Sequence, residues 1–267
     1  MNSENLAHNI RLDALEMIHK SHASHIGAIL SVTDIVSVLY SDILKVFPND
    51  PRSPERDRVI LSKGHAGAVL YAALAECGFF PIGNLDNYYQ NGSLYSGHVS
   101  RDVPGVDLST GSLGHGVCVA CGMALSAHVR NESHNVYAIV GDGECEEGSV
   151  WEMAAFANRY KLDNLTVIVD NNGMQAMGTC ENVLDFIDLE SKWAAFGWNV
   201  IPVKDGNDHN QLRNAFNSRL SGKPNVIIAH TVKGKGVSFM ENNLLWHYKD
   251  PQDEFYERAK EELGNRL

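Results

Sequence analysis

Short, continuously apolar runs alternate along the chain with segments of helical periodicity. The apolar runs have the length and β-branched content of buried strands, and they cover residues 58–61, 136–140, 165–169, 198–203 and 226–230. Apolar residues at helical spacing predict helices at residues 6–17, 33–45, 64–77, 117–129, 149–160 and 209–220, the second with Thr33 as its N-cap. Buried strands separated by helices are typical of a parallel sheet with helices on both faces. Because no linker or repeat interrupts this alternation, we expect one α/β domain over residues 1–267.

The charge balance is acidic, with 33 Asp and Glu residues against 22 Lys and Arg residues and a formal net charge of -11. Unselective nucleic-acid binding and adhesion to anionic membranes need the opposite balance, so we expect neither partner. No apolar run approaches the roughly 18 residues of a membrane span, and the polar N-terminus lacks a signal-peptide layout. The five cysteines are too sparse for a disulfide scaffold and favour a reducing, cytoplasmic location.

Two predicted strands end in polar segments that contain glycine: GDGE at 141–144 and DNNG at 170–173. Ligands of open α/β sheets bind beyond such strand ends. A bare pyrophosphate does not suit the first segment, because G-x-G-x-x-G is incomplete and Asp142 stands between the glycines. A divalent cation would resolve this conflict, and Mg²⁺ prefers oxygen ligands such as Asp142, Asn172 and the Met174 carbonyl. Taken singly, Asp142 and Asn172 are also ordinary turn residues, so their pairing at two strand ends carries the prediction.

Several motifs together resemble those of the transketolase family. GDGECEEG at 141–148 and VDNNGM at 169–174 look like its thiamine-diphosphate motif. Further family motifs match in the same order along the chain: SHIGA at 24–28, SKGHA at 62–66, SGH at 96–98, TGSLGHG at 110–116 and His247. The resemblance covers essentially the whole chain. It implies the thiamine-diphosphate-binding fold, with this chain as the diphosphate-binding domain.

The resemblance also implies roles for individual residues. Asp142, Asn172 and the Met174 carbonyl would bind Mg²⁺, which would hold the diphosphate of thiamine diphosphate. The residues that would contact or closely approach the cofactor are His65, Gly111, Ser112, Leu113, Gly143, Glu147, Asn172 and His247. Glu147 would help to link the cofactor sites across a dimer, and a solvated helix start is an equally good account of it.

Four histidines in separate loops that contain glycine match histidines of the family: His25, His65, His98 and His247. The ordinary pKa of imidazole lies near neutral pH, which suits proton transfer and hydrogen bonding around sugar hydroxyls and a carbonyl. We therefore expect these four residues to be catalytic.

Transketolases also need a pyrimidine-binding domain, which supplies the glutamate that activates the cofactor and the basic residues that hold a sugar phosphate. No segment between Met1 and Leu267 offers such a domain. The resemblance therefore implies the N-terminal subunit of a split transketolase, active only with a C-terminal, pyrimidine-binding partner subunit in an α2β2 heterotetramer. The expected reaction transfers a two-carbon ketol unit from a ketose, expected to be a phosphate, to an aldose.

The sequence is compatible with two other functions. The α subunit of a 2-oxo acid dehydrogenase is also a split thiamine enzyme, but the His-Gly loops near the N-terminus favour transketolase. A non-catalytic partner module needs only the fold, whereas this chain keeps the metal ligands and four histidines.

Lys233 and Lys235 either attract an anionic substrate or lie in a solvated loop. Cys118 and Cys121 are interpreted as small buried residues rather than a metal or redox pair.

Four residues depart from the family pattern. Ile26, Val99 and Ser112 stand where the family has prolines, and Tyr248 replaces a glycine beside His247. We expect all four on the substrate side of the site, which implies an unusual ketose donor.

Overall fold

The computed structural model describes residues 1–184 and 188–264. Five strands form a fully parallel sheet in the order β1-β2-β3-β5-β4. The strands are β1 (Arg58–Leu61), β2 (Val136–Gly141), β3 (Leu165–Asn171), β4 (Asn199–Val203) and β5 (Asn225–His230). Each lies within two residues of its predicted run, so the prediction of an α/β fold with a parallel sheet is confirmed.

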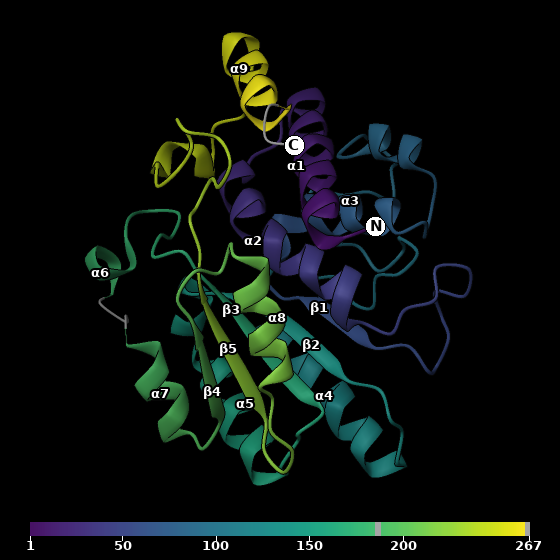
Figure 1. The fold of residues 1–267 in the computed structure, drawn as a ribbon, viewed down its shortest axis with the longest axis vertical. Coiled ribbons are helices and arrows are strands. Elements are labelled where there is room, and N and C mark those ends of the chain that lie inside the picture. Colours follow the sequence, from purple (N-terminus) through teal and green to yellow (C-terminus); the bar gives the residue numbers. More distant parts are fainter. Residues whose placement is uncertain (185–187, 265–267) are drawn as a thin grey trace.

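Helices cover both faces of this sheet. The α-helices of the described ranges are α1 (Ser3–Ser21), α2 (Ile26–Val38), α3 (Gly67–Glu76), α4 (His115–Arg130), α5 (Gly148–Arg159), α6 (Cys180–Val183), α7 (Leu189–Ala195), α8 (His209–Asn217) and α9 (Asp253–Gly264). Figure 1 shows α8 on one side of the sheet and α4 and α5 on the other. The last helix, α9, packs against α1, away from the sheet.

Successive residues of a strand point to opposite faces and enter two different hydrophobic clusters. In β2, Tyr137 and Ile139 pack in the cluster that contains α1, α2 and α3. Ala138 and Val140 pack in the cluster that contains α4 and α5. Because both faces are buried, the strands are apolar without the polar alternation of a half-exposed sheet.

The second helix begins earlier than its sequence pattern predicts. α2 starts at Ile26, and Thr33 lies in its interior, where its hydroxyl donates to the carbonyl of Ile29 at 2.9 Å. Thr33 is therefore not an N-cap. Every residue of α2 is buried, so its apolar residues do not form the one-sided stripe that reveals a helix. The residue before the helix is His25, which has a positive φ of 75°.

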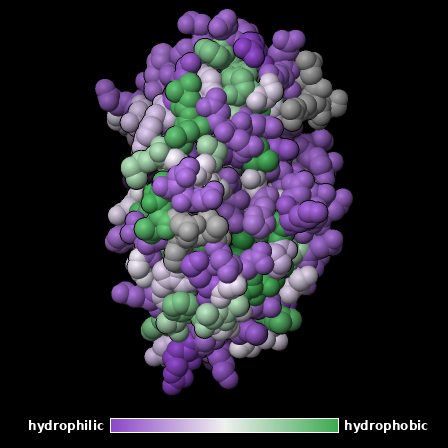
Figure 2. Space-filling view, turned by 90° about the vertical axis from the view of Figure 1, so that its left-hand side faces the viewer, coloured by the Kyte–Doolittle hydropathy of each residue, from purple (hydrophilic) through white to green (hydrophobic). Residues whose placement is uncertain are grey.

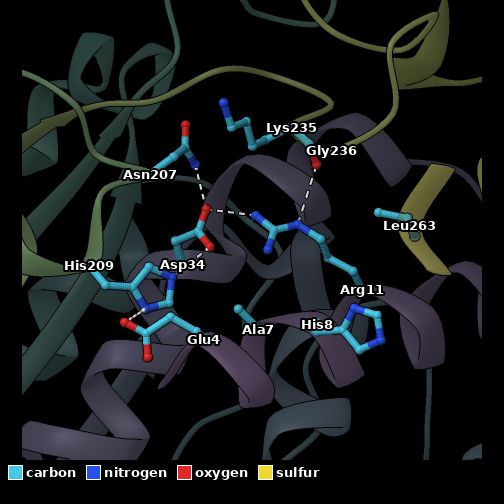
Figure 3. Close-up of a pocket in the computed structure, with 10 residues that line it drawn as sticks. All are labelled: Glu4, Ala7, His8, Arg11, Asp34, Asn207, His209, Lys235, Gly236 and Leu263. Carbon is cyan, nitrogen blue, oxygen red and sulfur yellow. Dashed lines mark hydrogen bonds and ion pairs between the residues drawn. The ribbon is translucent and has the colours of Figure 1, made fainter. Parts of the chain in front are cut away.

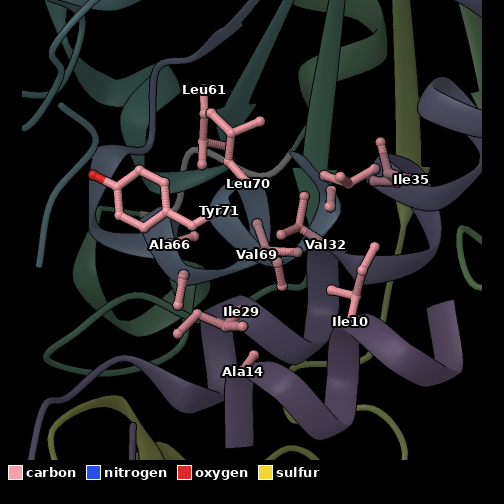
Figure 4. Packing of buried hydrophobic residues seen from close by; sticks show 14 of the residues in the cluster. Ile10, Ala14, Ile29, Val32, Ile35, Leu61, Ala66, Val69, Leu70 and Tyr71 are labelled. Carbon is pink, nitrogen blue, oxygen red and sulfur yellow. The ribbon is translucent and has the colours of Figure 1, made fainter. Parts of the chain in front are cut away.

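The stretch Ile26–Ile43 joins α2 to a π-helical turn and is long and apolar enough to cross a membrane. This finding corrects the expectation that no run approaches that length. However, 83% of the stretch is buried inside the fold. Figure 4 shows Ile29 and Val32 of α2 packed among neighbours that include Ile10 and Val69. The stretch is therefore a core helix by its packing.

The exposed surface reflects the acidic, polar composition. Figure 2 shows a face that is mostly hydrophilic, with hydrophobic residues in small separate groups. All five cysteines lie in the described ranges and are free thiols, with Cys121 buried and Cys118 half-buried. The interpretation of this pair as small packing residues is therefore confirmed for Cys121 and holds in part for Cys118.

Candidate active site

A cleft of about 360 Å³ opens at the carboxyl ends of the strands. Its walls come from the segments that follow β1, β2, β3 and β5, from the start of α2 and from loops before α4 and α9. The lining residues are His25, Ala28, Lys63, His65, His98, Gly111, Leu113, Gly141, Asp142, Gly143, Glu144, Asn172, Met174, Gln175, Ala176, Met177, Lys233 and His247. The cleft therefore brings together all the predicted site residues except Ser112 and Glu147.

Asp142 and Asn172 are brought together by the parallel sheet. β2 and β3 pair in a register that sets Gly141 beside Asp170, so the residues that follow leave the sheet side by side. A backbone contact joins the two segments directly, because the N–H of Gly173 donates to the Asp142 carboxylate at 2.6 Å. The two strand-end residues predicted as metal ligands therefore share one wall of the cleft.

The Asp142 carboxylate belongs to a set of oxygen atoms that suits a hard cation. Only 6% of Asp142 is exposed, and burial together with the negative charge of Asp170 raises its pKa above the usual value. Asn172 and Met174 line the same wall and offer an amide oxygen and a backbone carbonyl. A carboxylate, an amide and a carbonyl are the ligand types of Mg²⁺. Within residues 1–184 and 188–264, no group of three or more His, Cys, Asp or Glu side chains is placed to hold a metal ion.

The four predicted histidines gather in the cleft. The ring centroid of His25 lies 5.2 Å from that of His65 and 5.1 Å from that of His247. The ring of His98 lies 5.9 Å from that of His25. In addition, the backbone N–H of His25 donates to the carbonyl of His247 at 2.8 Å. The fold thus joins four segments that are distant in the sequence into one cluster of imidazoles.

Burial keeps the imidazoles of His25, His65 and His247 neutral at physiological pH. It is the main cause that lowers the pKa of His25 to about 4 and that of His247 to about 3, with a further contribution from nearby positive charges. Burial, followed by the charge of Lys63, also lowers the pKa of His65 well below its usual value. A neutral imidazole has one nitrogen that donates and one that accepts. The rings of His25 and His65 can therefore form hydrogen bonds of both kinds with a sugar hydroxyl.

A buried ion pair that is not among the predicted site residues lies beneath the cleft. The ammonium of Lys63 contacts the carboxylate of Asp170 at 2.5 Å, and both side chains have almost no exposed surface. Asp170 also accepts hydrogen bonds from the hydroxyl of Ser31 in α2, at 2.6 Å, and from the hydroxyl of Thr231 after β5. The signal for Asp170 was its place at a strand end. Lys63 stood inside the SKGHA motif without a role of its own.

Glu144 is a second buried carboxylate without a predicted role. It accepts hydrogen bonds from the hydroxyl of Ser62 at 2.5 Å and from the N–H of Gly114 at 2.9 Å. It also accepts from the N–H of Gly141 at 3.3 Å. Glu144 therefore joins the loop before α4, which lines the cleft, to the ends of β1 and β2 through these hydrogen bonds.

Lys233 is buried, with 1% of its surface exposed. Its Nζ lies 3.1 Å from the carbonyl oxygen of Met174 and 3.0 Å from that of Gln175. The Nδ1 atom of His247 lies 3.1 Å from the same Nζ. Burial and the nearby charge of Lys63 lower the pKa of Lys233 to about 8. The interpretation of a solvated loop is therefore wrong for Lys233, which lies in the cleft wall.

Two predicted cofactor residues lie outside the cleft. Ser112 is exposed, and Glu147 is exposed at the start of α5. The position of Glu147 suits both accounts of it, a solvated helix start and a link across a dimer. His115 is exposed as well, with its Nδ1 atom 3.1 Å from the carbonyl oxygen of Leu113.

The residues that depart from the family pattern do not all face the substrate side. Ile26 and Val99 are buried in the hydrophobic core, so the expectation is wrong for these two. Tyr248 is 66% exposed. Its ring lies 4.7 Å from that of His247 and 6.1 Å from that of His25, which places it beside the histidine cluster.

A second cavity of about 210 Å³ lies between α1, α2 and the loops beside α8 and β5 (Figure 3). Asp34 contacts Arg11 at 2.6 Å and His209 at 3.0 Å on its wall. Burial tends to raise the pKa of Asp34, but Arg11 and the hydrogen bond from His209 hold it below its usual value. Lys235 lines this cavity and is not among the lining residues of the cleft with the histidine cluster.

We predict that acid destabilises the fold partly through His25. The unfolded chain protonates this imidazole near its ordinary pKa of about 6.5, whereas in the folded chain its pKa is about 4. The unfolded state therefore binds the proton first, and the free energy of unfolding falls as the pH drops from about 6.5 to about 4. In the variant His25→Asn this decline should be smaller, as measured by urea unfolding across that pH range.

Asn is a suitable replacement because it tolerates the positive φ of His25 better than most residues. Asp13 acts in the opposite direction, because burial and Glu76 raise its pKa to about 7. Asp13 is present in both proteins, so its contribution cancels in the difference between their free energies of unfolding. A difference in unfolding free energy that does not change with pH would contradict the prediction.

Comparison with known proteins identifies the family. Residues 2–266 match the family described as "Transketolase, thiamine diphosphate binding domain". The chain is 40% identical over 255 residues to a subunit of the apulose-4-phosphate transketolase of Phocaeicola vulgatus, and the match covers 95% of this chain and 90% of that protein. It is 41% identical over 260 residues to the 6-deoxy-6-sulfo-D-fructose transketolase subunit SqwG of Clostridium sp. (strain MSTE9), and this match covers 96% of this chain and 94% of that protein.

Longer transketolases match over part of their length. Human transketolase is 36% identical over 264 residues, which are 98% of this chain and 42% of the human protein. The solved structure of transketolase from Leishmania mexicana is similar with a TM-score of 0.93 at 30% identity, over 99% of this chain and 41% of that one. The solved structure of transketolase from Campylobacter jejuni is similar with a TM-score of 0.93 at 32% identity, over 99% of this chain and 43% of that one.

The family match covers almost the whole chain, and the relatives of similar length are named as transketolase subunits. The fold and the strand-end motifs agree with both findings. The chain belongs to the transketolase family, in which it corresponds to the thiamine diphosphate binding domain and to the N-terminal subunit of the split enzymes.

Proposed function

We propose that this chain, as one domain over residues 1–267, works with a partner subunit to transfer a two-carbon ketol unit from a ketose phosphate to an aldose. One observation carries the proposal: the strand-end residues Asp142 and Asn172 line the same cleft as the four histidines. The strand ends would hold the diphosphate of thiamine diphosphate, which supplies the nucleophilic carbon for ketol transfer when bound. The named relatives favour this reaction over that of a 2-oxo acid dehydrogenase.

Mg²⁺ would be held by the carboxylate of Asp142, the amide oxygen of Asn172 and the carbonyl of Met174. The buried charge of Asp142 supports this assignment, because a buried carboxylate needs an opposite charge and the hydrogen bonds to Asp142 from the N–H groups of Gly143 and Gly173 bring no positive charge. Gly111 and Gly143 line the cleft and, without side chains, would let a diphosphate approach the backbone. We propose that further contacts to the cofactor come from Ser112, Leu113, Glu147, His65 and His247.

The histidines would bind and orient the hydroxyl groups of the sugar. Burial keeps His25, His65 and His247 neutral, so each ring carries one donor and one acceptor nitrogen, and Nδ1 of His247 already contacts Lys233. His98 is exposed at the cleft, where substrate would enter. Hydrogen bonds of both kinds suit a substrate with adjacent hydroxyl and carbonyl groups and allow protons to move between them.

A pyrimidine-binding subunit would complete the site. Support comes from the relatives named as subunits, which this chain matches over nearly their whole length. Human transketolase, in contrast, extends well beyond the matched region. Two copies of each subunit would give two equivalent sites in an α2β2 assembly. We place the enzyme in the cytoplasm, which suits its free thiols.

We predict that Asp142→Asn and Asn172→Ala abolish Mg²⁺-dependent binding of thiamine diphosphate to the chain in complex with its partner subunit. Loss of a group that only orients a metal ligand costs about 10–100-fold in affinity, so loss of a ligand should cost at least about 100-fold. Calorimetric titration with the cofactor in Mg²⁺ measures the effect. Thermal unfolding verifies that each variant folds.

Asn171→Ala is the matched control, because the Asn171 side chain contacts His230 outside the cleft. It should bind the cofactor with the affinity of the parent chain. If the Asp142 and Asn172 variants also bind like the parent, the metal assignment is wrong.

The reaction is tested with the full chain alone and in complex with its partner, each given Mg²⁺, thiamine diphosphate, a ketose phosphate and an aldose phosphate. We expect ketol transfer by the complex and none by the chain alone. Replacement of His25 or His65 by alanine should lower turnover by roughly 10²–10⁴-fold if the residue transfers protons.

Three outcomes contradict the proposal. Turnover by the chain alone, at the level of the complex, contradicts the need for a partner. Decarboxylation of a 2-oxo acid with acyl transfer to a lipoyl carrier supports the dehydrogenase. A complex that binds the cofactor but transfers nothing from any of a panel of ketoses supports a non-catalytic module.

A further inference from the structure

Lys233 contacts one of the four cleft histidines through a buried polar atom. Its Nζ has three polar neighbours: the carbonyl oxygen of Met174 at 3.1 Å, that of Gln175 at 3.0 Å and the Nδ1 atom of His247 at 3.1 Å. Both side chains are buried, Lys233 with 1% and His247 with 8% of its surface exposed. Water therefore has little access to this contact.

The three contacts determine which nitrogen of His247 carries the proton. An ammonium group has three N–H donors and no acceptor. Two of the neighbours are carbonyl oxygens, which can only accept. The third neighbour must then accept as well, so the Nδ1 atom of His247 has no hydrogen. A neutral imidazole without a hydrogen on Nδ1 carries it on Nε2.

The charges around the contact favour this arrangement. Burial, followed by the charge of Lys63, lowers the pKa of Lys233 to about 8, and the carboxylates of Asp142 and Asp170 limit this shift, so Lys233 stays charged at neutral pH. Lys233 in turn opposes a second positive charge on the ring of His247, which burial already disfavours. The contact therefore joins a charged lysine to a neutral histidine.

We infer that Lys233 is a positioning residue that holds His247 in the Nε2–H tautomer, so that His247 donates a hydrogen bond to a substrate oxygen in the cleft. The substrate part of this inference rests on the proposed function. A ring with Nδ1 engaged and Nε2 protonated has no free nitrogen that accepts a proton. His247 is thus a fixed donor, whose value lies in being oriented before a substrate oxygen arrives. Proton transfer then falls to His25, His65 and His98.

The tautomer is measured directly by nitrogen-15 NMR on the full chain, without cofactor or substrate. The signals of His247 are assigned by their loss in the variant His247→Asn. We expect a protonated Nε2 and an unprotonated Nδ1 in the parent chain. In Lys233→Met, which keeps the length of the side chain but removes its donors, the fraction protonated at Nδ1 should rise.

Lys235→Met is the matched control, because Lys235 lines the second cavity instead. It should leave the tautomer of His247 unchanged. In the complex, Lys233→Met should lower kcat by at least about tenfold with a smaller change in KM, because a histidine in the wrong tautomer can lose about 10⁴-fold in turnover. Lys233→Arg, which keeps a donor, should restore part of kcat.

A proton on Nδ1 in the parent chain would overturn the inference. So would a tautomer that stays the same in a folded Lys233→Met variant. If that variant does not fold, the parent spectrum alone decides. Because the spectrum needs no turnover, an Nε2–H ring in a complex without ketol transfer would refute the proposed function and leave the role of Lys233 standing.

Discussion

Asp170 is the last residue but one of β3, and its carboxylate has no exposed surface and contacts three other segments of the chain. The ammonium of Lys63 comes from the segment that follows β1, the hydroxyl of Ser31 from α2 and that of Thr231 from the residue that follows β5. A buried charge that loses its partner is strongly destabilising, so these contacts hold α2 and the segments that follow β1 and β5 against the end of β3. The contacts of Asp170 therefore position the walls of the cleft. These walls include the loop that carries His65 and the start of α2 beside His25.

The same charges explain why the cleft suits a cation. Among the described residues in and directly beneath it, three carboxylates, those of Asp142, Glu144 and Asp170, are buried with two ammonium groups, those of Lys63 and Lys233. The buried histidines add no charge near neutral pH. Lys63 neutralises Asp170, and backbone and hydroxyl donors solvate Glu144. Asp142 accepts hydrogen bonds from two backbone N–H groups, and none of the ion pairs among the described residues involves it. A divalent ion would offset both the charge of Asp142 and that of a diphosphate in an otherwise acidic chain.

Sequence patterns predicted the strands well, because each is buried on both faces and therefore apolar throughout. They predicted the closeness of Asp142 and Asn172 because neighbouring parallel strands end at one edge of the sheet. The start of α2 was missed, since a helix buried on every side has no apolar stripe. The histidine cluster came from the family resemblance alone, because no local pattern shows that four distant loops meet. The burial of Lys233 was left open, because it depends on contacts with segments far away in the sequence.

The proposed function depends on one set of oxygen atoms at the ends of β2 and β3. The most direct measurement is a crystal structure of the complex with its partner subunit, thiamine diphosphate and Mn²⁺ in place of Mg²⁺. The account predicts anomalous density for the metal bonded to the carboxylate of Asp142, the amide oxygen of Asn172 and the carbonyl of Met174. A bound cofactor with the metal on the histidines, or with no metal at the strand ends, would contradict it.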